Sequence, residues 1–464
     1  MKQNNVIFPI ELISRELDYK LLVAALLLRK EGEITFCQHD LANEVMKKCN
    51  GGVYFGKNVV NPRKYSIYQN YKNNNFLIIH LDEEGAVYPG PESVMLNNLG
   101  MRVDINSLSS EDYVCTWGVT QEKFYKSKIN SESSVNINTT GHTRFDLYRE
   151  PYRGIYKNEV EKIKQEFGPY VLINTHFSFA VNNFGISDTF SGRTGYGLTP
   201  DFTSRIVEEW AEETQKASHF ISLAHHLSAA MPDINFVLRP HPAEDLKFYK
   251  TALKGLKNIL ITNEGSVGPW LLGAELLIHD RCTTAIEAFF SNVPVINHKL
   301  IKSEKWDNRI TNRIGVETSS NLETENAVKL ILEDRNGYKE KNNLGEDQFN
   351  LIYNFKKDRV PEFIEFLDQK ISNKKEVRNL KSPSKSFLYL NELSYKILNF
   401  IKRPIRFLFM KQKHREYIAS KSVFPGFDKK KILKKLDFLE KLTGKSFEIS
   451  YISERIFVLK QKNN

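Results

Sequence analysis

Residues 235–242 read Asn-Phe-Val-Leu-Arg-Pro-His-Pro, a short apolar run that leads into a turn containing two prolines. A run of this length that ends at proline is typical of a buried strand. A long helical pattern precedes it, over 201–230, and another begins at residue 283. Similar apolar runs lie on either side of it, at 170–173, 258–261, 275–278 and 293–296. This alternation of strands and helices predicts βαβ units and a parallel sheet.

The first part of the chain has the same alternation. A helix is expected over 12–30, and the pattern is broken at 150–154 by Glu-Pro-Tyr-Arg-Gly. The expected strands are 6–10, 34–36, 76–80, 113–116 and 134–138. Two such series predict an α/β protein with two Rossmann-like domains that face one another across a cleft. The predicted domains are 1–150 and 151–372, followed by a basic C-terminal extension over 373–464.

The positive charge is concentrated in that extension. The 464 residues include 66 Lys and Arg against 56 Asp and Glu, a net charge of +10, but residues 371–464 alone contribute +15 and the remainder −5. A nucleic-acid-binding protein is therefore a remote alternative, and no nucleic acid is expected as a partner. Segment 385–464 interleaves apolar residues with Lys and Arg, which indicates contact with an anionic membrane surface. The alternative is a basic helical subdomain that packs on the rest of the protein.

The four cysteines, Cys37, Cys49, Cys115 and Cys282, are far apart in the sequence and form no metal-binding motif. They predict reduced thiols, and neither a metal nor another cofactor is expected. The first ten residues do not resemble a signal peptide, and no apolar run approaches the roughly 20 residues that a spanning helix needs. The expected location is the cytoplasm, with peripheral contact at the inner face of the membrane.

Arg239 and His241 follow the strand at 235–238 directly. Ligands of open α/β sheets bind at the carboxyl ends of strands, so both side chains are expected in the binding cleft. A planar cation and an imidazole suit a phosphate or a leaving group that needs a proton. The alternative is an ordinary turn whose histidine bonds only to the backbone.

A second strand–turn–helix sequence runs from 275 to 288 and includes Arg281 in the turn. Thr283 or Thr284 is expected to cap the helix, and its free N–H groups with the two hydroxyls form an anion site. Glu287, one turn into the helix, is a candidate for binding a ribose diol. The alternatives are a simple cap and a solvated helix face. Two weaker candidates for contact with the same ligand are Glu264 and Asn174.

In the first domain, the strand at 76–80 leads into Asp82, Glu83, Glu84 and a glycine. Mutual repulsion among three carboxylates is expected to raise at least one pKa, which suits a general base or a nucleophile. An acidic turn without a chemical role is the alternative. Arg15 and Glu16 lie at the start of the first helix, where Arg15 is expected to hold an anionic substrate group. Both are otherwise first-turn helix charges.

Together these residues resemble the GT-B glycosyltransferases of bacterial surface-carbohydrate synthesis. Residues 82–85 are similar to the acidic motif of bacterial sialyltransferases, 241–242 to their His-Pro motif, and 283–284 to their paired hydroxyl motif. Thr-Gly-His-Thr-Arg-Phe-Asp at 140–146 resembles a motif of capsule and teichoic-acid transferases, and 8–18 resembles surface carbohydrate biosynthesis proteins. The third acidic residue departs from the sialyltransferase motif and leaves the identity of the catalytic carboxylate open.

The resemblance implies a metal-independent glycosyltransferase that moves a Kdo- or nonulosonic-acid-type sugar from a CMP donor onto a capsule, O-antigen or similar glycan. Its partners are a nucleotide sugar and a lipid-linked or oligosaccharide acceptor. The implied catalytic residues are Asp82, Glu83, Glu84 and His241; those for the donor are Asn174, Arg239, His241, Glu264, Arg281, Thr283, Thr284 and Glu287; those for a substrate carboxylate or the acceptor are Arg15 and Glu16. Alternatives on the same fold are a CDP-glycerol or UDP-sugar transferase and a UDP-sugar 2-epimerase. Inversion or retention, the exact sugar and the oligomeric state stay open.

Overall fold

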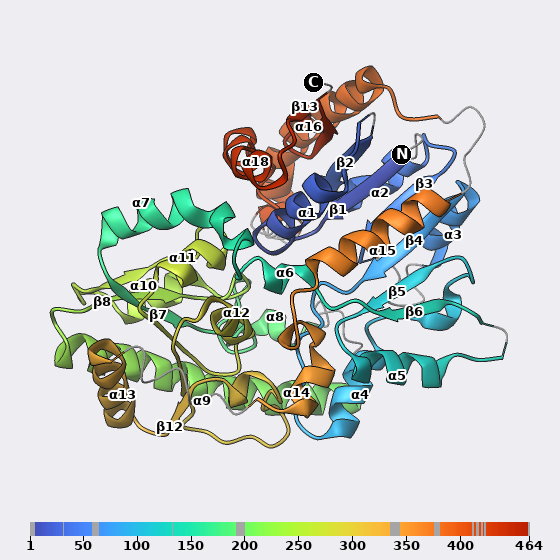
Figure 1. Ribbon diagram of the computed structural model, residues 1–464. Helices are drawn as coiled ribbons and strands as arrows, with labels where there is room; N and C mark the ends of the chain where they lie inside the picture. The colour runs from blue at the N-terminus through green and yellow to red at the C-terminus, as the bar shows by residue number, and fades with distance from the viewer. Residues whose placement is uncertain are drawn as a thin grey trace. The chain divides into compact units, whose positions relative to one another are not determined.

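The protein is an α/β protein with two compact units in this computed structural model (Figure 1). The structure describes residues 5–30, 32–57, 65–131, 133–191, 200–334, 344–374, 381–410, 413, 417–418, 421 and 424–462. Unit 1 draws on 1–86, 92–155 and 346–464, and unit 2 on 87–91 and 156–345. Each unit contains one large and mainly or wholly parallel sheet, which confirms the predicted class of two Rossmann-like α/β domains.

The sheet of unit 1 has eight strands in the order β13-β14-β2-β1-β3-β4-β5-β6. Its strands are β1 Asn5–Ile10, β2 Glu33–Gln38, β3 Gly52–Gly56, β4 Phe76–Leu81, β5 Tyr113–Thr116, β6 Asn136–Thr139, β13 Phe447–Ser453 and β14 Ile456–Gln461. Its helices are α1 Ile13–Leu27, α2 His39–Met46, α3 Tyr65–Asn73, α4 Glu92–Gly100, α5 Val119–Lys128, α6 Thr143–Asp146, α14 Glu346–Leu351, α15 Val360–Asn373, α16 Lys385–Phe409 and α18 Lys429–Thr443. β1, β3 and β4 are buried along their whole length, so the core of unit 1 lies at the centre of this sheet.

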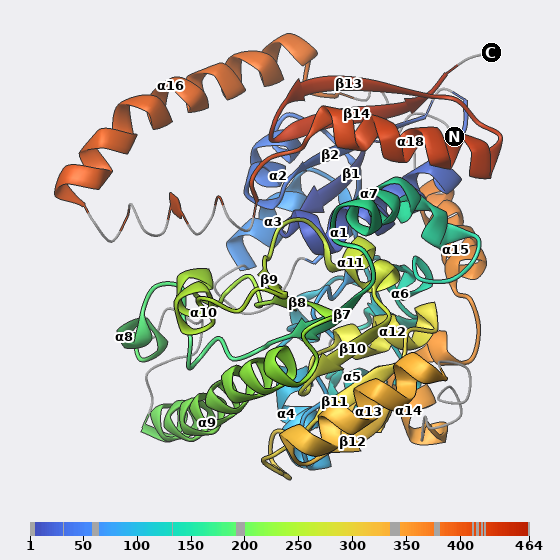
Figure 2. The same ribbon diagram turned by 90° about the vertical axis from the view of Figure 1, so that its left-hand side faces the viewer.

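The C-terminal extension completes this sheet. β14 pairs antiparallel with β2, with Ile456 opposite Cys37, and β13 pairs with β14 at the edge. Figure 2 shows this red hairpin beside the blue strands. Phe36 and Phe457 stack with ring centroids 4.7 Å apart, so burial of aromatic surface holds the hairpin in place. The extension is therefore part of unit 1.

The predicted end of the second domain at residue 372 also differs from the structure, because the chain returns to unit 1 near residue 346. Asp146 is the anchor for this returning segment: its carboxylate accepts from Asn354 Nδ2 at 2.7 Å and from the Arg359 amide at 3.1 Å. α15 then buries Phe363 and Leu367, and the helix contacts α1 and α6. These contacts join residues far apart in sequence, so the local pattern of strands and helices does not reveal the return.

The sheet of unit 2 has six parallel strands in the order β12-β11-β10-β7-β8-β9. Its strands are β7 Tyr170–Asn174, β8 Asn235–Arg239, β9 Ile259–Ile261, β10 Leu276–His279, β11 Val295–His298 and β12 Val316–Thr318. Its helices are α7 Lys157–Phe167, α8 Ile186–Thr189, α9 Pro200–Ala230, α10 Leu246–Ala252, α11 Val267–Gly273, α12 Thr284–Ser291 and α13 Asn321–Glu333. Ser320 and Asp245 cap α13 and α10 with their side chains, which fixes where these helices begin.

The four cysteines are all buried and form no disulfide in the structure. The described residues contain no group of three or more His, Cys, Asp or Glu side chains placed to hold a metal ion.

Candidate functional site

The acidic motif of unit 1, residues 82–85, directly follows the carboxyl end of β4. Gly85 closes it where no larger residue fits, because a Cβ atom there would lie 2.5 Å from the Trp117 ring. The same indole donates from Nε1 to the carbonyl of Asp82 at 2.7 Å. Asp82 and Glu83 are buried, whereas the Glu84 side chain is 38% exposed. The motif therefore presents Glu84 to solvent and directs Glu83 into the protein.

Glu83 is the centre of a buried polar network. Its carboxylate lies 2.9 Å from Lys20 Nζ and 3.3 Å from His142 Nε2, and it accepts a hydrogen bond from the Tyr19 hydroxyl. Arg144 donates to the backbone carbonyl of Glu83 at 3.0 Å. Burial by itself raises the pKa of Glu83, but Lys20 and His142 outweigh it and hold that pKa well below the ordinary range. Glu83 is thus an ionised structural residue.

His142 is neutral in this network. Its Nδ1 accepts from the Arg144 amide at 3.2 Å, which assigns the ring proton to Nε2, the atom beside Glu83. Burial lowers the pKa of His142 to about 4. Lys20 therefore supplies the full positive charge that balances Glu83, and it also contacts the Glu16 carboxylate at 3.2 Å.

Glu84 lies among three cations. Its carboxylate oxygens are 2.9 Å from Arg102 Nη1, 3.2 Å from Arg15 Nη2 and 3.7 Å from Lys57 Nζ. Partial burial raises the pKa of Glu84, but Lys57, Arg15 and Arg102 together lower it to about 2. We call these four residues the Glu84 cluster. Its three cations also contact further carboxylates: Lys57 lies 3.3 Å from Glu11, Arg15 lies 3.7 Å from Glu16, and Arg102 lies 3.9 Å from Asp82.

The expectation that repulsion raises a pKa in this motif is wrong for Glu83 and Glu84. The two carboxylates contact different cations: Glu83 lies 2.9 Å from Lys20 Nζ, and Glu84 lies 2.9 Å from Arg102 Nη1. Attraction to those cations decides the direction of both shifts.

Of the two predicted residues in α1, Arg15 belongs to the Glu84 cluster, and the Glu16 carboxylate lies 3.7 Å from Arg15 Nη2. Glu16 is 2% exposed and accepts from the amides of Glu11 and Leu12 at 3.1 and 3.0 Å. These contacts satisfy free N–H groups at the start of α1, so Glu16 stabilises the helix end.

In unit 2, Asn174 and Arg239 end neighbouring strands and lie opposite each other in the sheet. The Arg239 guanidinium donates to the carbonyls of Glu264 and Gly265 at 3.0 and 3.1 Å and lies over the Trp270 ring. Burial lowers the pKa of Arg239 to about 10, so it stays charged at neutral pH. Arg239 therefore places a buried cation at the strand end and fixes the loop that holds Glu264, whose side chain is exposed.

His241 is half-buried in the turn that follows β8. Its Nδ1 accepts from the Ala243 amide at 3.2 Å, which assigns the proton of the neutral ring to Nε2. The His176 ring lies edge-on to it with centroids 4.9 Å apart. The backbone thus orients His241 so that Nε2 is the donor, as a phosphate ligand requires.

The turn after β10 contains a non-glycine residue in the left-handed region, Arg281, with φ of 56°. Its guanidinium lies 3.3 Å from the Glu212 carboxylate and donates to the Trp306 carbonyl at 3.4 Å. Left-handed backbone at a non-glycine residue is uncommon and concentrates at functional sites. The contact with Glu212 ties the Arg281 side chain to α9 and balances its charge inside unit 2.

The two threonines at the start of α12 have different surroundings. Thr284 is buried and its hydroxyl lies 3.2 Å from Cys282 Sγ. Thr283 occupies the N-cap position but its side chain does not cap the helix, since its φ of −61° and ψ of −16° are helical. The expectation of a side-chain cap is wrong, because a capping hydroxyl needs an extended backbone at that position.

The likeness of this chain to known proteins is distant. No family model matches the chain, and no curated protein matches it. Among solved structures, HepE of Anabaena with UDP and glucose is 11% identical over 80% of this chain and 100% of its own, with a TM-score of 0.41. The wall teichoic acid polymerase TagF is 13% identical over 80% of this chain and 88% of its own, with a TM-score of 0.48. A UDP-GlcNAc 2-epimerase of Methanocaldococcus jannaschii is 14% identical over 79% of this chain and 99% of its own, with a TM-score of 0.45. We take no function from likenesses this distant.

The structure thus places the predicted site residues in two groups, one in each unit. Arg15 and Glu84 belong to the first, and Asn174, Arg239 and His241 lie at strand ends in the second. Glu287 is 7% exposed, within the first half of α12. Sequence reasoning missed the cations Lys57 and Arg102. Lys57 follows the unrecognised strand β3, so recognising that strand would have placed it at the same sheet edge as Asp82.

Proposed function

We propose that the chain is a glycosyltransferase that transfers a Kdo- or nonulosonic-acid-type sugar from a CMP donor onto a surface glycan. The observation that supports this most directly is the Glu84 cluster. Its three cations converge on one partly exposed carboxylate and are themselves partly exposed, with the Arg102 side chain at 26% and Arg15 at 22%. An ulosonic acid has a carboxylate on its anomeric carbon, and partly exposed guanidinium groups such as those of Arg15 and Arg102 suit that group.

The carboxyl edge of the unit 2 sheet supports a phosphate site. His241 Nε2 is a donor, Arg239 contributes a buried positive charge, and Thr283 is a half-buried residue whose hydroxyl does not cap its helix. In this proposal these groups stabilise the negative charge that develops on the phosphate as CMP leaves with the electrons of the broken glycosidic bond. No resident cofactor takes part.

Glu84 is the carboxylate that we assign to the reacting sugar, because it is partly exposed whereas Asp82 and Glu83 are buried. A pKa of about 2 makes it a weak base in the free protein. Binding of a sugar carboxylate to Arg15, Lys57 or Arg102 shares those cations with a second anion, and this raises the pKa of Glu84. Glu84 then either takes the proton of the acceptor hydroxyl, with inversion, or attacks the anomeric carbon, with retention.

The donor assignment is tested by incubating the full chain with CMP-Kdo, CMP-nonulosonic acids, UDP-sugars and CDP-glycerol, each with a glycan acceptor, and measuring nucleotide release. We expect release of CMP, and we expect Glu84→Gln to reduce it by about a hundredfold or more. Turnover of only UDP-sugars or CDP-glycerol contradicts the proposed donor. Interconversion of a UDP-sugar without an acceptor instead identifies an epimerase.

The two threonines of α12 give a matched pair for the phosphate site. Thr283→Val is expected to weaken CMP binding about tenfold, since it removes a hydrogen-bond donor to a charged group. Thr284→Val is expected to leave CMP affinity nearly unchanged, because its hydroxyl is buried against Cys282. Isothermal titration calorimetry with CMP measures both. Equal losses in the two variants argue against a phosphate contact by Thr283.

A further inference from the structure

Helix α16 is attached to unit 1 through its polar side. Glu392 is buried, accepts from the Ser453 hydroxyl at 2.7 Å and lies 3.3 Å from Arg455 Nη1. Arg455 also lies over the Tyr395 ring, 3.6 Å from its centroid. These contacts fix one face of the first half of the helix against β13 and the turn that follows it.

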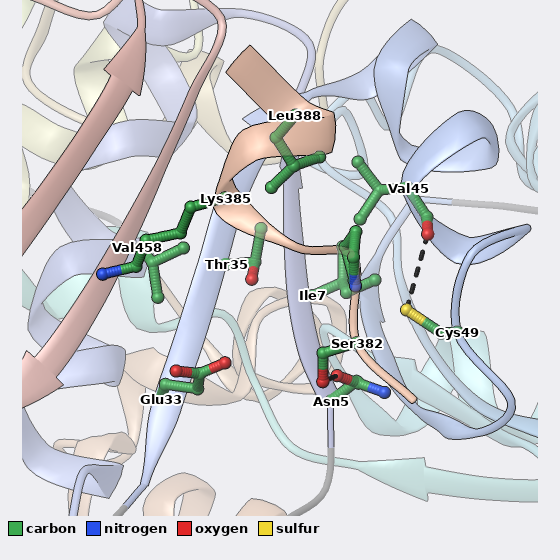
Figure 3. Close-up of a pocket in the computed structure, with 11 residues that line it drawn as sticks. Asn5, Ile7, Glu33, Thr35, Val45, Cys49, Ser382, Lys385, Leu388 and Val458 are labelled. Atoms are coloured by element: carbon green, nitrogen blue, oxygen red, sulfur yellow. Dashed lines mark hydrogen bonds between the residues drawn. The ribbon is translucent and has the colours of Figure 1, made fainter. Parts of the chain in front are cut away.

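The chain just before α16 is also fixed. Asn5 Nδ2 donates to the Lys381 carbonyl at 2.9 Å, and the Ser382 hydroxyl donates to Asn5 Oδ1 at 2.5 Å. Asn5 and Ser382 line a small cavity, together with Leu388 of the helix (Figure 3). The volume of this cavity is about 40 Å³. The start of α16 therefore has a defined place on the sheet of unit 1.

The opposite face of α16 is apolar and exposed to solvent. Its side chains recur at intervals of three and four residues, which places them on one side of a helix. We call the following six residues the apolar face of α16: Leu390 (61% exposed), Leu393 (44%), Ile397 (52%), Phe400 (83%), Ile401 (52%) and Ile405 (47%). A helix of a soluble protein normally buries such a face, and a large exposed apolar patch marks an interaction surface.

The charges of α16 distinguish among the possible partners. Lys396, Lys402 and Arg403 are exposed, whereas the one acidic residue of the helix, Glu392, is buried and paired. A second copy of this helix would bring like charges together, which opposes self-association. An anionic surface that accepts apolar side chains complements both features. Among the described helices, none is long and apolar enough to cross a membrane.

We propose that α16 is an interfacial helix that binds the surface of an anionic lipid bilayer. The apolar face inserts among the acyl chains near the headgroups, and Lys396, Lys402 and Arg403 bind the lipid phosphates. The helix lies in the plane of the bilayer and anchors unit 1 through the contacts of Glu392. This inference is independent of the donor and of the proposed transfer reaction.

Sedimentation of the full chain with vesicles tests it. We expect binding to vesicles of phosphatidylglycerol and phosphatidylcholine, and much weaker binding to pure phosphatidylcholine. Leu390→Glu is expected to reduce binding about tenfold or more, because it places a charge at the anionic interface. The matched control is Leu330→Glu in unit 2, where the leucine is 65% exposed on α13, and we expect wild-type binding. Both leucines are exposed, so circular dichroism should show folded protein in each case.

The role of charge is tested by a second pair of variants. Each basic residue near an anionic surface contributes about a fivefold gain in affinity, so K402Q/R403Q is expected to reduce binding about twenty-five-fold. Lys123→Gln, an exposed lysine of α5, is the control and is expected to bind as the wild type does. Equal binding to neutral vesicles, or equal losses in variant and control, overturns the proposal. So does a dimer in sedimentation velocity that Leu390→Glu abolishes, because the face is then covered by a second copy.

Discussion

Replacing Glu83 by Gln is expected to lower the free energy of unfolding by about 3 kcal/mol, since it breaks a buried ion pair and leaves one charge without its main partner. Lys20 then keeps its contacts with the Glu16 carboxylate, at 3.2 Å, and with the carbonyl of Pro9, at 2.7 Å. The substitution preserves the shape of the side chain, so the loss reports charge and not a cavity. Urea unfolding followed by circular dichroism measures it.

Glu84→Gln is the matched control for this prediction. The two residues are neighbours in the sequence and both contact cations, but Glu84 is partly exposed and solvent screens its interactions. We expect a change of about 1 kcal/mol or less. Equal losses in the two variants contradict a central role of Glu83 in the buried network.

The loss in the free energy of unfolding caused by Glu83→Gln is also expected to depend on pH. The pKa of Glu83 is lowered in the folded protein, so its stabilising contribution is present above its ordinary pKa in the unfolded chain and is lost as the pH falls. The difference between wild type and variant is therefore expected to shrink as the pH drops below about 4.5. A difference that stays constant over this range contradicts the ionised state assigned to Glu83.

Replacing His241 by Ala is expected to reduce turnover of the donor by about 10²–10³, the usual effect of removing one preorganised donor from a developing negative charge. The backbone amide of Ala243 donates to Nδ1, which assigns the proton of the neutral ring to Nε2. His241→Gln keeps an N–H group near that position and is expected to recover part of the rate. Steady-state kinetics of CMP release measure both variants.

His225 provides the control histidine. It is exposed on α9 and its Nε2 lies 3.1 Å from the Ala252 carbonyl, away from the strand ends. His225→Ala is expected to retain nearly full activity. Near-normal turnover in His241→Ala, with CMP as the product in the wild type, contradicts the phosphate role while leaving the donor assignment intact.

The sequence was sufficient to predict the parallel sheets and the strand ends that hold Arg239, His241 and Asp82, because apolar runs bounded by turn residues are local signals. It was not sufficient for β3, a five-residue strand with glycine at both ends. The hairpin β13–β14 was also missed, since its place depends on pairing with β2, far away in the chain.

The ionisation states of Glu83 and Glu84 could not be predicted from the sequence. Three adjacent carboxylates suggest repulsion, but Glu83 meets Lys20 and Glu84 meets Arg102 only after the chain has folded. The direction of each shift depends on these distances and on burial, and neither follows from residue spacing.

The pairing of β14 with β2 has a consequence for folding during synthesis. Ile456 pairs with Cys37, and the whole of unit 2 lies between them in the sequence. A ribosome therefore releases all of unit 2 before the final strands of unit 1 exist, and unit 2 has the opportunity to fold first. Until then the edge of β2 lacks its partner and exposes unpaired backbone groups, so the nascent chain carries an open strand edge prone to association.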